Sequence, residues 1–499
     1  MRWAHGAGPA RQHHLARTLR RGVLLLLVVG IGSFFLTHPW DSVREISDPV
    51  EHFKYGSVGA DDENGLPLRI IEVLPTVFAD LLPAGAPSDL SAFGFIYEPG
   101  RRMPVGFSER VRIVPLIGMN CATCHTSVVR VSPDDRGYVE IAMGSTILDL
   151  QGFLSFLFAV VDDPRFSSET LIAAMNEVEP LSTIDTWLYT ALIPTMRSRV
   201  KTQAEQLQQL FSDDHPRFGP GRVDTFNPYK LVQLAAHYPD GLTPEESIGT
   251  SRYPSIWNQQ AKDGLAHNWD GNAISVQDRN VGAAFGAGAT PKTLDLEVLT
   301  EVEAFISTLP APRFPALASL DRDLVAEGEQ VFAAMCADCH APGGSQLGEV
   351  IALAEIGTDP HRHQSYTTKL NDLFNSFGDG EPWDLNDMRT TDGYAARLLD
   401  GIWARGPYLH NGSVPTLWDL LTPEDQRNGG QSSLWVGHGV IDLDHVGVRT
   451  DLTEFQGRAM FELDLTTAGN SNQGHSGPGY GTDLPEAQRR ALIEYMKTL

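Results

Sequence analysis

All four cysteines of this 499-residue chain lie in two copies of one five-residue pattern, Cys-x-x-Cys-His. Two thiols three positions apart can each form a thioether to one edge of a haem, and the histidine that follows then lies under the iron as its proximal ligand. A zinc site would need further Cys or His at ligand spacing, and a redox dithiol has no use for the histidine. The pattern therefore predicts two covalently bound c-type haems. The expected haem-binding residues are Cys121, Cys124 and His125 in the first copy, and Cys336, Cys339 and His340 in the second.

The charge of the chain limits its partners. Its formal net charge is −25, from 38 basic and 63 acidic residues. The first 21 residues hold five arginines and no acid, so the remaining body is more acidic still. Such a body repels nucleic acid and anionic lipid surfaces. It suits a basic electron-transfer partner, although acidity that only keeps a protein soluble is the commoner explanation.

An apolar run without charge, residues 22–36, follows the arginines directly. It is short for a full membrane span of ~20 residues, and no small-x-small cleavage site closes it. We interpret residues 1–40 as a targeting segment, either an uncleaved anchor in the inner membrane or a cleaved signal. Both interpretations export the bulk of the chain, so we expect a periplasmic or other extracytoplasmic location. Bacterial attachment of c-type haem generally takes place there, and no cysteine is left for a structural disulfide.

Two similar helical endings divide the exported part. The segment 303–309 resembles the C-terminal segment 493–499, and prolines that prevent helix continuation follow the first of them at positions 310, 312 and 315. We therefore expect an N-terminal c-type haem domain at 41–309, a proline linker at 310–317 and a C-terminal cytochrome c domain at 318–499. The expected fold class is mainly α, with two cytochrome c-type haem domains, long loops and few short strands.

Helical spacing of apolar residues supports this division. Residues 321–335, before the second motif, place Gly328 and Phe332 on one face. A small residue at the point where an aromatic-bearing last helix crosses resembles the arrangement of cytochromes c. In the first domain, residues 184–210 are expected to form a long amphipathic helix that is kinked at Pro194.

A haem iron needs a fifth ligand and can take a sixth. His125 and His340 are the expected fifth ligands. His410 is the preferred sixth ligand of the second haem, because Pro407 and Asn411-Gly412 favour a turn that can hold its ring on a loop; a structural histidine is the alternative. Weaker candidates in the same domain are Met388, Met460, His438, His445 and His475. For the first haem no sixth ligand stands out, and an open position there would be the catalytic one.

Between the two motifs, Trp269 lies in the polar segment 264–272. It is interpreted either as simple packing or as an electron relay between the haems, since indole is polarisable and oxidisable.

Taken together, these residues resemble the bacterial dihaem c-type cytochrome and peroxidase superfamily, which includes dihaem cytochrome c peroxidases, the maturation enzyme of methylamine dehydrogenase and rubber oxygenases. The resemblance rests on the two haem motifs, on Trp269-Asp270-Gly271 and on the segment 407–415. In the family this tryptophan sits between the haems, which implies Trp269 as the relay. The segment 407–415 resembles the loop that bears the sixth ligand of the C-terminal haem.

The chain also departs from the peroxidases of this superfamily. Those carry a Gln ten residues and a Glu twenty residues after the tryptophan, whereas Arg279 and Ala289 stand here. Without that carboxylate no acid or base is evident for splitting the O–O bond of peroxide. The small, apolar stretch 281–289 suits O2 and a hydrophobic substrate better, which places the chain nearest the rubber oxygenase-like branch. In that branch Phe285 falls near an aromatic residue of the distal pocket.

We therefore expect an exported oxidoreductase in which the N-terminal haem reacts with O2 or peroxide and the C-terminal haem exchanges electrons through Trp269. One alternative is a non-catalytic electron-transfer dihaem cytochrome c; another is a haem protein that binds a partner complex at the membrane. The expected partners are a small redox protein or quinone-linked electron donor, and O2, peroxide or a hydrophobic substrate. We expect no nucleic acid, and membrane contact only through the N-terminal segment.

Overall fold

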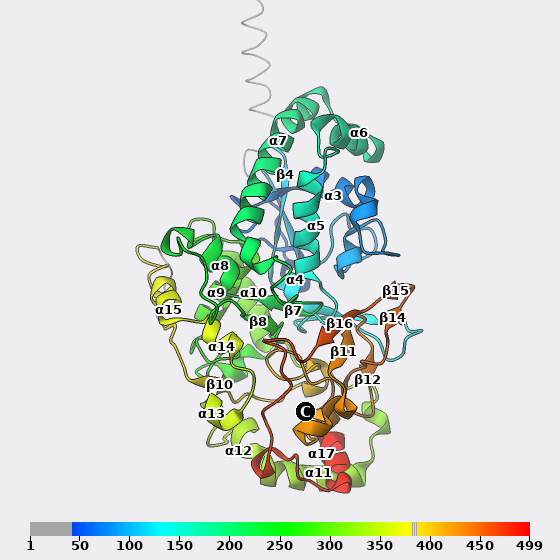
Figure 1. Ribbon diagram of the computed structural model, residues 1–499, viewed down its shortest axis with the longest axis vertical. Coiled ribbons are helices and arrows are strands. Elements are labelled where there is room, and N and C mark those ends of the chain that lie inside the picture. The colour runs from blue at the N-terminus through cyan, green and yellow to red at the C-terminus, as the bar shows by residue number, and fades with distance from the viewer. Residues whose placement is uncertain (1–41, 382, 384, 386) are drawn as a thin grey trace, which may run out of the picture.

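Two stacked regions make up the molecule, one above the other in Figure 1. The computed structural model describes residues 42–381, 383, 385 and 387–499. The expected targeting segment, including the apolar run 22–36, lies outside these residues. Within them, no helix is both long enough and apolar enough to cross a membrane.

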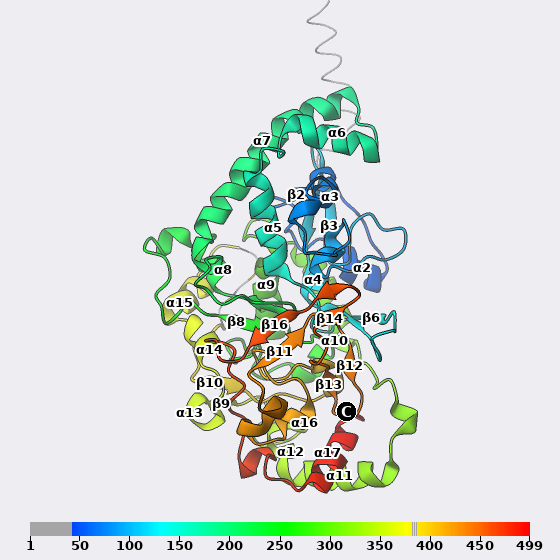
Figure 2. The ribbon, with the colours of Figure 1, turned by 45° about the vertical axis from the view of Figure 1, so that its right-hand side comes forward.

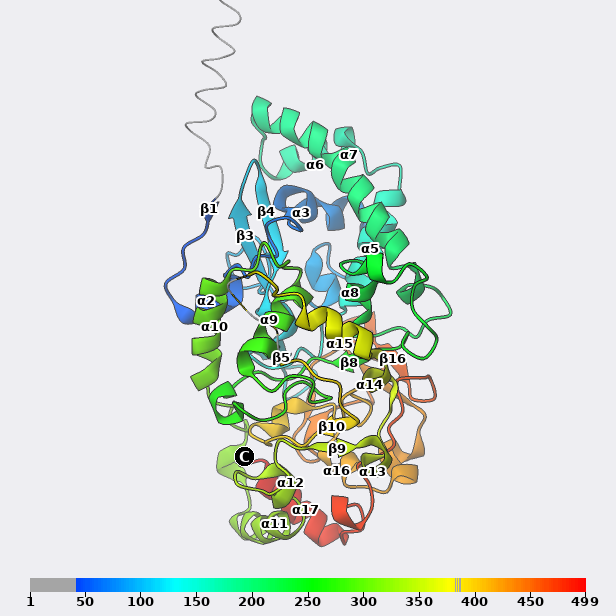
Figure 3. The same cartoon turned by 90° about the vertical axis from the view of Figure 1, so that its left-hand side faces the viewer.

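The upper region is a small antiparallel sheet covered by helices. Its strand order is β1-β3-β4-β2. The sheet packs against one long and several shorter helices (Figures 1 and 3). The strands and helices are β1 (Ser42–Val43), β2 (Leu66–Pro67), β3 (Phe107–Val111), β4 (Pro115–Met119), α3 (Leu68–Val77), α5 (Leu150–Asp162), α6 (Ser168–Val178) and α7 (Thr183–Gln206).

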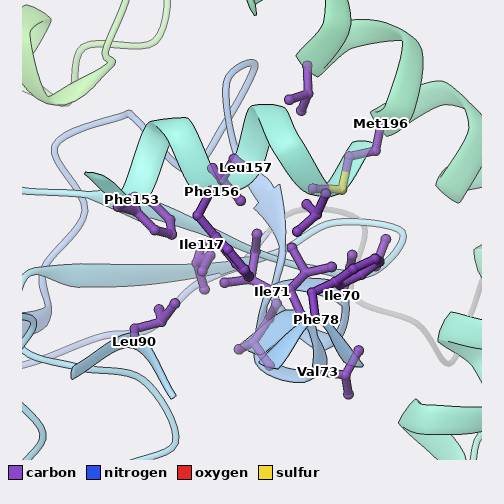
Figure 4. Close-up of a cluster of buried hydrophobic side chains, with 14 of the residues drawn as sticks. Ile70, Ile71, Val73, Phe78, Leu90, Ile117, Phe153, Phe156, Leu157 and Met196 are labelled. Carbon is purple, nitrogen blue, oxygen red and sulfur yellow. The ribbon is translucent and has the colours of Figure 1, made fainter. Parts of the chain in front are cut away.

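Apolar spacing explains why these helices pack on the sheet. In α5, Phe153, Phe156 and Leu157 fall on one buried face, and Asp149 caps the first turn by accepting from the backbone N–H of Gly152 at 2.8 Å. That face meets Ile70 and Ile71 of α3 (Figure 4). The expected helix at 184–210 is present as α7, and α6 precedes it; a serine caps the start of each.

The first haem motif follows this sheet directly. Strand β4 ends at Met119, and Asn120 then caps the one-turn helix α4 (Cys121–Cys124) by accepting from the backbone N–H of Ala122 at 2.9 Å. Three more helices surround α4 in the middle of the molecule. They are α2 (Pro49–Tyr55), α9 (Val276–Ala287) and α10 (Leu296–Thr308).

The second haem motif lies at the opposite end, where the first and last helices of this part cross (Figure 2). These helices are α11 (Arg322–Met335), α12 (Ala337–His340) and α17 (Glu486–Met496). The expected crossing at Gly328 is confirmed, because Phe332 packs on Tyr495 with ring centroids 5.2 Å apart. A Cβ atom on Gly328 would lie 1.9 Å from the carbonyl oxygen of Ala491.

Strands are more numerous than the sequence indicated. Helices still predominate among the described residues, but the protein is mixed, with several two-stranded antiparallel sheets in its loops. The expectation of few strands was wrong because strands of two to four residues show too little alternation of apolar and polar residues to be recognised in the sequence. The pairs are β5 (Thr126–Val129) with β6 (Tyr138–Ile141), β7 (Arg222–Asp224) with β8 (Thr250–Arg252), β9 (Val350–Ala352) with β10 (Gly393–Ala395), β11 (Ser433–Val436) with β16 (Phe461–Asp464), β12 (Ile441–Asp442) with β13 (Gly447–Val448), and β14 (Glu454–Phe455) with β15 (Arg458–Ala459).

The hydrophobic core runs across the expected domain boundary at 310–317. One buried cluster joins Trp257 and Ile306 to Trp403 and Leu492. Another joins Phe285 of α9 to Phe374, which lies on one of the short helices of the C-terminal half. The two halves of the chain therefore share a hydrophobic core. Their division into two haem domains stays a prediction. The remaining short helices are α8 (Asn227–Leu231), α13 (Leu353–Ile356), α14 (His361–Ser365), α15 (Thr368–Asn375) and α16 (Leu417–Leu420).

The helix crossing gives a first test. Gly328→Ala places a methyl group against the backbone of α17, so the helices must separate, and we expect a loss of about 1–3 kcal/mol in the free energy of unfolding. Gly282→Ala is the matched control, since nothing lies within 4 Å of that Cβ position in α9, and it should be neutral or slightly stabilising. Denaturant unfolding measures both. Equal effects of the two variants would contradict the close crossing.

Candidate haem sites

A cavity of about 460 Å³ opens beside the second haem motif. Its size is that of a cofactor site. Cys336, Cys339 and His340 lie on its wall, together with the two other histidines His410 and His475. Most of the remaining wall is apolar, with leucines and isoleucines from several loops and from α17.

Both proximal histidines are held in the same way. Nδ1 of His340 donates to the carbonyl oxygen of Arg397 at 2.7 Å, and Nδ1 of His125 donates to the carbonyl oxygen of Pro254 at 2.8 Å. A carbonyl oxygen only accepts, so each bond places the ring proton on Nδ1 and leaves Nε2 with its lone pair. This is the orientation in which a histidine binds a metal through Nε2.

His475 faces His340 across the cavity. The two ring centroids are 6.3 Å apart and the planes differ by 36°. Nδ1 of His475 is buried without a hydrogen-bond partner among the residues that the structure describes. Burial, with His340 as a further cause, lowers the pKa of His475 to about 3, so the ring is neutral, as a metal ligand requires.

Hydrogen bonds hold the segment 469–475, called the strap below, which carries His475. The guanidinium of Arg427, itself buried, donates to the carbonyl oxygens of Gly474 at 2.9 Å and His475 at 3.1 Å. Asn411 and Ser413 each donate to the carbonyl oxygen of Ser471 at 2.9 Å. The loop after His410 thus holds the strap that presents His475.

His410 lies in the cavity wall with a different partner. Its Nε2 is 3.1 Å from the hydroxyl of Tyr394, and the two rings stack at 4.2 Å. Burial lowers its pKa to about 3. The structure thus brings His410 to the second site, while its role as an iron ligand stays a prediction.

Buried arginines line one side of the same cavity. Arg252, Arg397 and Arg405 all contribute to the wall. Arg405 pairs with Asp400. Burial lowers the pKa of Arg252 to about 9 and that of Arg397 to about 10. This concentration of positive charge complements the propionates of a haem. The cavity, the two thiols, the paired histidines and the arginines therefore fit a c-type haem, which would supply one-electron redox chemistry here.

The first motif has the two cysteines and the histidine that the attachment of a haem requires. Cys121, Cys124 and His125 are held between α2, α9 and the segment 252–255. A guanidinium nitrogen of Arg279 lies 3.4 Å from Nε2 of His125. Burial, followed by the charge of Arg279, lowers the pKa of His125 to about 3. The site does not fit a haem completely, because the guanidinium of Arg279 would have to lie further from Nε2 of His125 for an iron to bind that nitrogen.

Phe285 lies on the same helix as Arg279, in an aromatic cluster. Its ring centroid is 5.4 Å from that of Phe377 and 5.3 Å from that of Trp383. Cys121 packs against the same cluster, and Ala289 is fully buried in it. The second half of helix α9 therefore forms an apolar wall on one side of the first motif, and the charged residues Asp278 and Arg279 lie in its first half.

Trp269 is half-buried in the wall of the second cavity. Its indole N–H donates to the carbonyl oxygen of Arg252 at 3.1 Å. The guanidinium carbons of Arg252 and Arg397 lie 5.9 and 5.1 Å from its ring centroid. Trp269 therefore adjoins the second site and contacts the segment that leads to the first.

That segment, residues 252–255, contacts both sites, and no motif or spacing in the sequence indicates it. The backbone N–H of Arg252 donates to the carbonyl oxygen of His410 at 2.9 Å, and Pro254 and Ser255 line the second cavity. Pro254 also accepts from His125, and the buried Tyr253 hydroxyl lies beside the Cys124 thiol. One short extended segment therefore joins the surroundings of the two haem motifs.

Other ligand sets were sought in the described part of the chain. No group of three or more His, Cys, Asp or Glu side chains there is arranged to hold a free metal ion. The zinc interpretation of the two motifs thus finds no ligand set among these residues.

Comparisons with known proteins agree with this description. Residues 393–429 match the model of the RoxA-like, cytochrome c-like family. This part contains His410, Arg397 and Arg427, and it supports a relationship to rubber oxygenase-like cytochromes. Two similar proteins from Sinorhizobium fredii are the uncharacterized proteins y4iJ and y4iM. Protein y4iJ is 27% identical over 84% of this chain and 86% of its own length; protein y4iM is 31% identical over 49% of this chain and 63% of its own. The chain therefore contains a cytochrome c-like domain, which implies covalently bound c-type haem.

The arginines of the cavity give a second test. Arg397→Met removes a buried positive charge beside the second haem motif, so the oxidised haem becomes relatively more stable and its reduction potential should fall. Arg490→Met is the matched control, because Arg490 is exposed on α17 and is screened by solvent. Redox titration followed by the haem absorption bands measures both. A potential that Arg397→Met leaves at the wild-type value would contradict the assigned charge effect.

Proposed function

We propose that this protein is an exported dihaem c-type cytochrome that acts as an oxidoreductase. In this proposal the C-terminal haem, held between His340 and His475, is the electron-transfer centre, and the N-terminal haem is the site of reaction with O2 or peroxide. The observation that carries the proposal is the pair of histidines facing each other across the second cavity.

The spacing of this pair suits two axial ligands of one iron. Two metal–imidazole bonds of about 2 Å each, together with the half-widths of the two rings, span about 6 Å. The centroids of His340 and His475 are 6.3 Å apart. An iron with both axial positions filled leaves no place for a substrate, which favours electron transfer over catalysis at this haem.

The surroundings of the first motif support a reactive site there. Helix α9 and the turn after it offer a small, apolar wall around Phe285 and Ala289 beside the first motif. An apolar wall favours O2 or a hydrophobic substrate over water.

A path between the sites supports electron exchange. Trp269 is the proposed relay, since it lies at the second cavity and donates to the segment 252–255, which in turn holds His125. In this proposal electrons enter from a small redox protein or a quinone-linked donor on the periplasmic side of the inner membrane. The acidic surface would then favour a basic donor.

The alternative is a non-catalytic electron-transfer cytochrome with two haems. The closeness of Arg279 to Nε2 of His125, 3.4 Å, favours this alternative, because a guanidinium there restricts access to an iron. Carbon monoxide distinguishes the two functions. A catalytic first haem binds it after reduction, whereas a carrier with two filled axial positions on each iron does not.

The assignment of His475 can be tested directly. His475→Ala should convert the second haem from low spin to high spin and let it bind carbon monoxide, because one axial position becomes vacant. His410→Ala is the matched control, since His410 is buried in the same wall but pairs with Tyr394. Electron paramagnetic resonance of the ferric proteins measures both.

The reverse outcome would overturn the ligand assignment. If His410→Ala produced the high-spin haem and His475→Ala left the spectrum unchanged, His410 would be the sixth ligand. Addition of imidazole to the His475→Ala protein should restore the low-spin spectrum, and a circular dichroism spectrum and unfolding midpoint like those of the wild type should show that the fold is kept.

A further inference from the structure

The four most exposed large hydrophobic side chains of the described residues belong to hairpins at one end of the molecule. Their exposed fractions are 71% for Trp187, 56% for Val178, 56% for Ile113 and 46% for Ile184. Val178 ends α6, Ile184 and Trp187 lie in the first turns of α7, and Ile113 is at the tip of the β3–β4 hairpin. All three ribbon views place these hairpins at the end furthest from α11 and α17. Single exposed apolar residues are ordinary, but a cluster of this kind marks an interaction surface.

Helix α7 is unusual on its outer face. Its first half buries Tyr189 and Ile193 on the inner face, as the sequence predicts. The exposed residues of the same half should be charged in a helix that faces water. Instead every one of them is uncharged. They are Thr183, Ile184, Trp187, Thr190, Ala191, Pro194 and Thr195. The helix is thus not amphipathic here, contrary to the expectation from its sequence.

The chain leaves the described structure at this same end. Ser42 of β1 pairs with Val111 of β3, two residues before Ile113. The uncharged run 22–36 ends six residues earlier in the sequence. Six residues span at most about 20 Å. If that run enters a bilayer, this end of the molecule lies at the bilayer surface.

We propose that the outer face of α7, with Val178 and Ile113, is a membrane-contact surface that dips into the interface of a zwitterionic bilayer. An exposed tryptophan beside aliphatic residues is typical of such interfacial surfaces. The charges around the patch are acidic or paired, which favours zwitterionic over anionic lipid. Glu177 and Glu179 flank Val178, Glu179 is engaged by Arg69 and Arg102, and Arg112 beside Ile113 pairs with Asp62. This surface adds a second membrane contact to the one expected from the N-terminal segment.

The contact would also fix the orientation of the molecule. The second haem motif lies at the opposite end from α6 and α7 (Figure 2). The cavity beside it would then face away from the bilayer, where a water-soluble redox partner has access. This inference is independent of the assignment of the haem ligands.

Quenching of tryptophan fluorescence by brominated lipid tests the proposal. The full haem-loaded chain is mixed with phosphatidylcholine vesicles whose acyl chains carry bromine, and the emission is compared with that in unbrominated vesicles. We expect quenching of the wild-type chain, and Trp187→Phe should remove more than half of it. Trp435→Phe is the matched control, because Trp435 lies on β11, away from this end, and it should leave the quenching intact.

Three results would overturn the proposal. Quenching that persists fully in Trp187→Phe would confine lipid contact to the N-terminal segment, which carries its own Trp3 and Trp40. The absence of quenching in the wild type would exclude lipid contact altogether. Concentration-dependent self-association that Trp187→Ser abolishes, without lipid quenching, would identify the patch as an interface between two copies of this chain.

Discussion

The hydrogen bond from each motif histidine to a backbone carbonyl is the constraint on which both candidate haem sites depend. A histidine that follows Cys-x-x-Cys can turn either ring nitrogen toward the space beside the thiols. The carbonyl oxygens of Pro254 and Arg397 decide which nitrogen this is, because each accepts a hydrogen bond from the Nδ1–H group and leaves Nε2 to face the thiols. Both carbonyls come from loops far along the chain, so the sites exist only when the shared core has folded. The first of these loops also lines the second cavity, which makes the two sites parts of one structure.

Buried charge shapes the second site further. Three arginines line its wall; Arg405 pairs with Asp400, and Arg252 donates to the carbonyl oxygen of Arg405. Burying several cations with a single carboxylate in close contact is costly. A group that carries negative charge into the cavity offsets this cost, and haem propionates are such a group. The same cations would favour the reduced iron of a bound haem, so the residues that would hold the haem would also raise its potential. Trp269 lies against two of these guanidiniums, which ties the proposed electron path to the same charges.

The sequence was informative where the chemistry is local. The crossing at Gly328 and the long helix α7 could be predicted, because each depends on spacing within a short segment. The two haem motifs are equally local, and two covalent haems stay a prediction from them. The sixth ligand of the second haem could not be decided from local spacing. His410 was preferred for its turn residues, and its role as a ligand stays a prediction. The structure also places His475 in the cavity wall, at a position that depends on hydrogen bonds from Arg427 and Asn411 that no spacing reveals. The segment 252–255 escaped notice for the same reason, and the uncharged outer face of α7 became visible only once exposure was known.

Low-temperature electron paramagnetic resonance of the ferric protein, combined with a count of covalent haems per chain, tests the central claim most directly. The account predicts two haems, one low-spin with two histidine ligands and one high-spin, and binding of carbon monoxide by a single haem after reduction. Two low-spin haems that ignore carbon monoxide would contradict the catalytic role of the first site. A single haem per chain would contradict the account of two linked sites altogether.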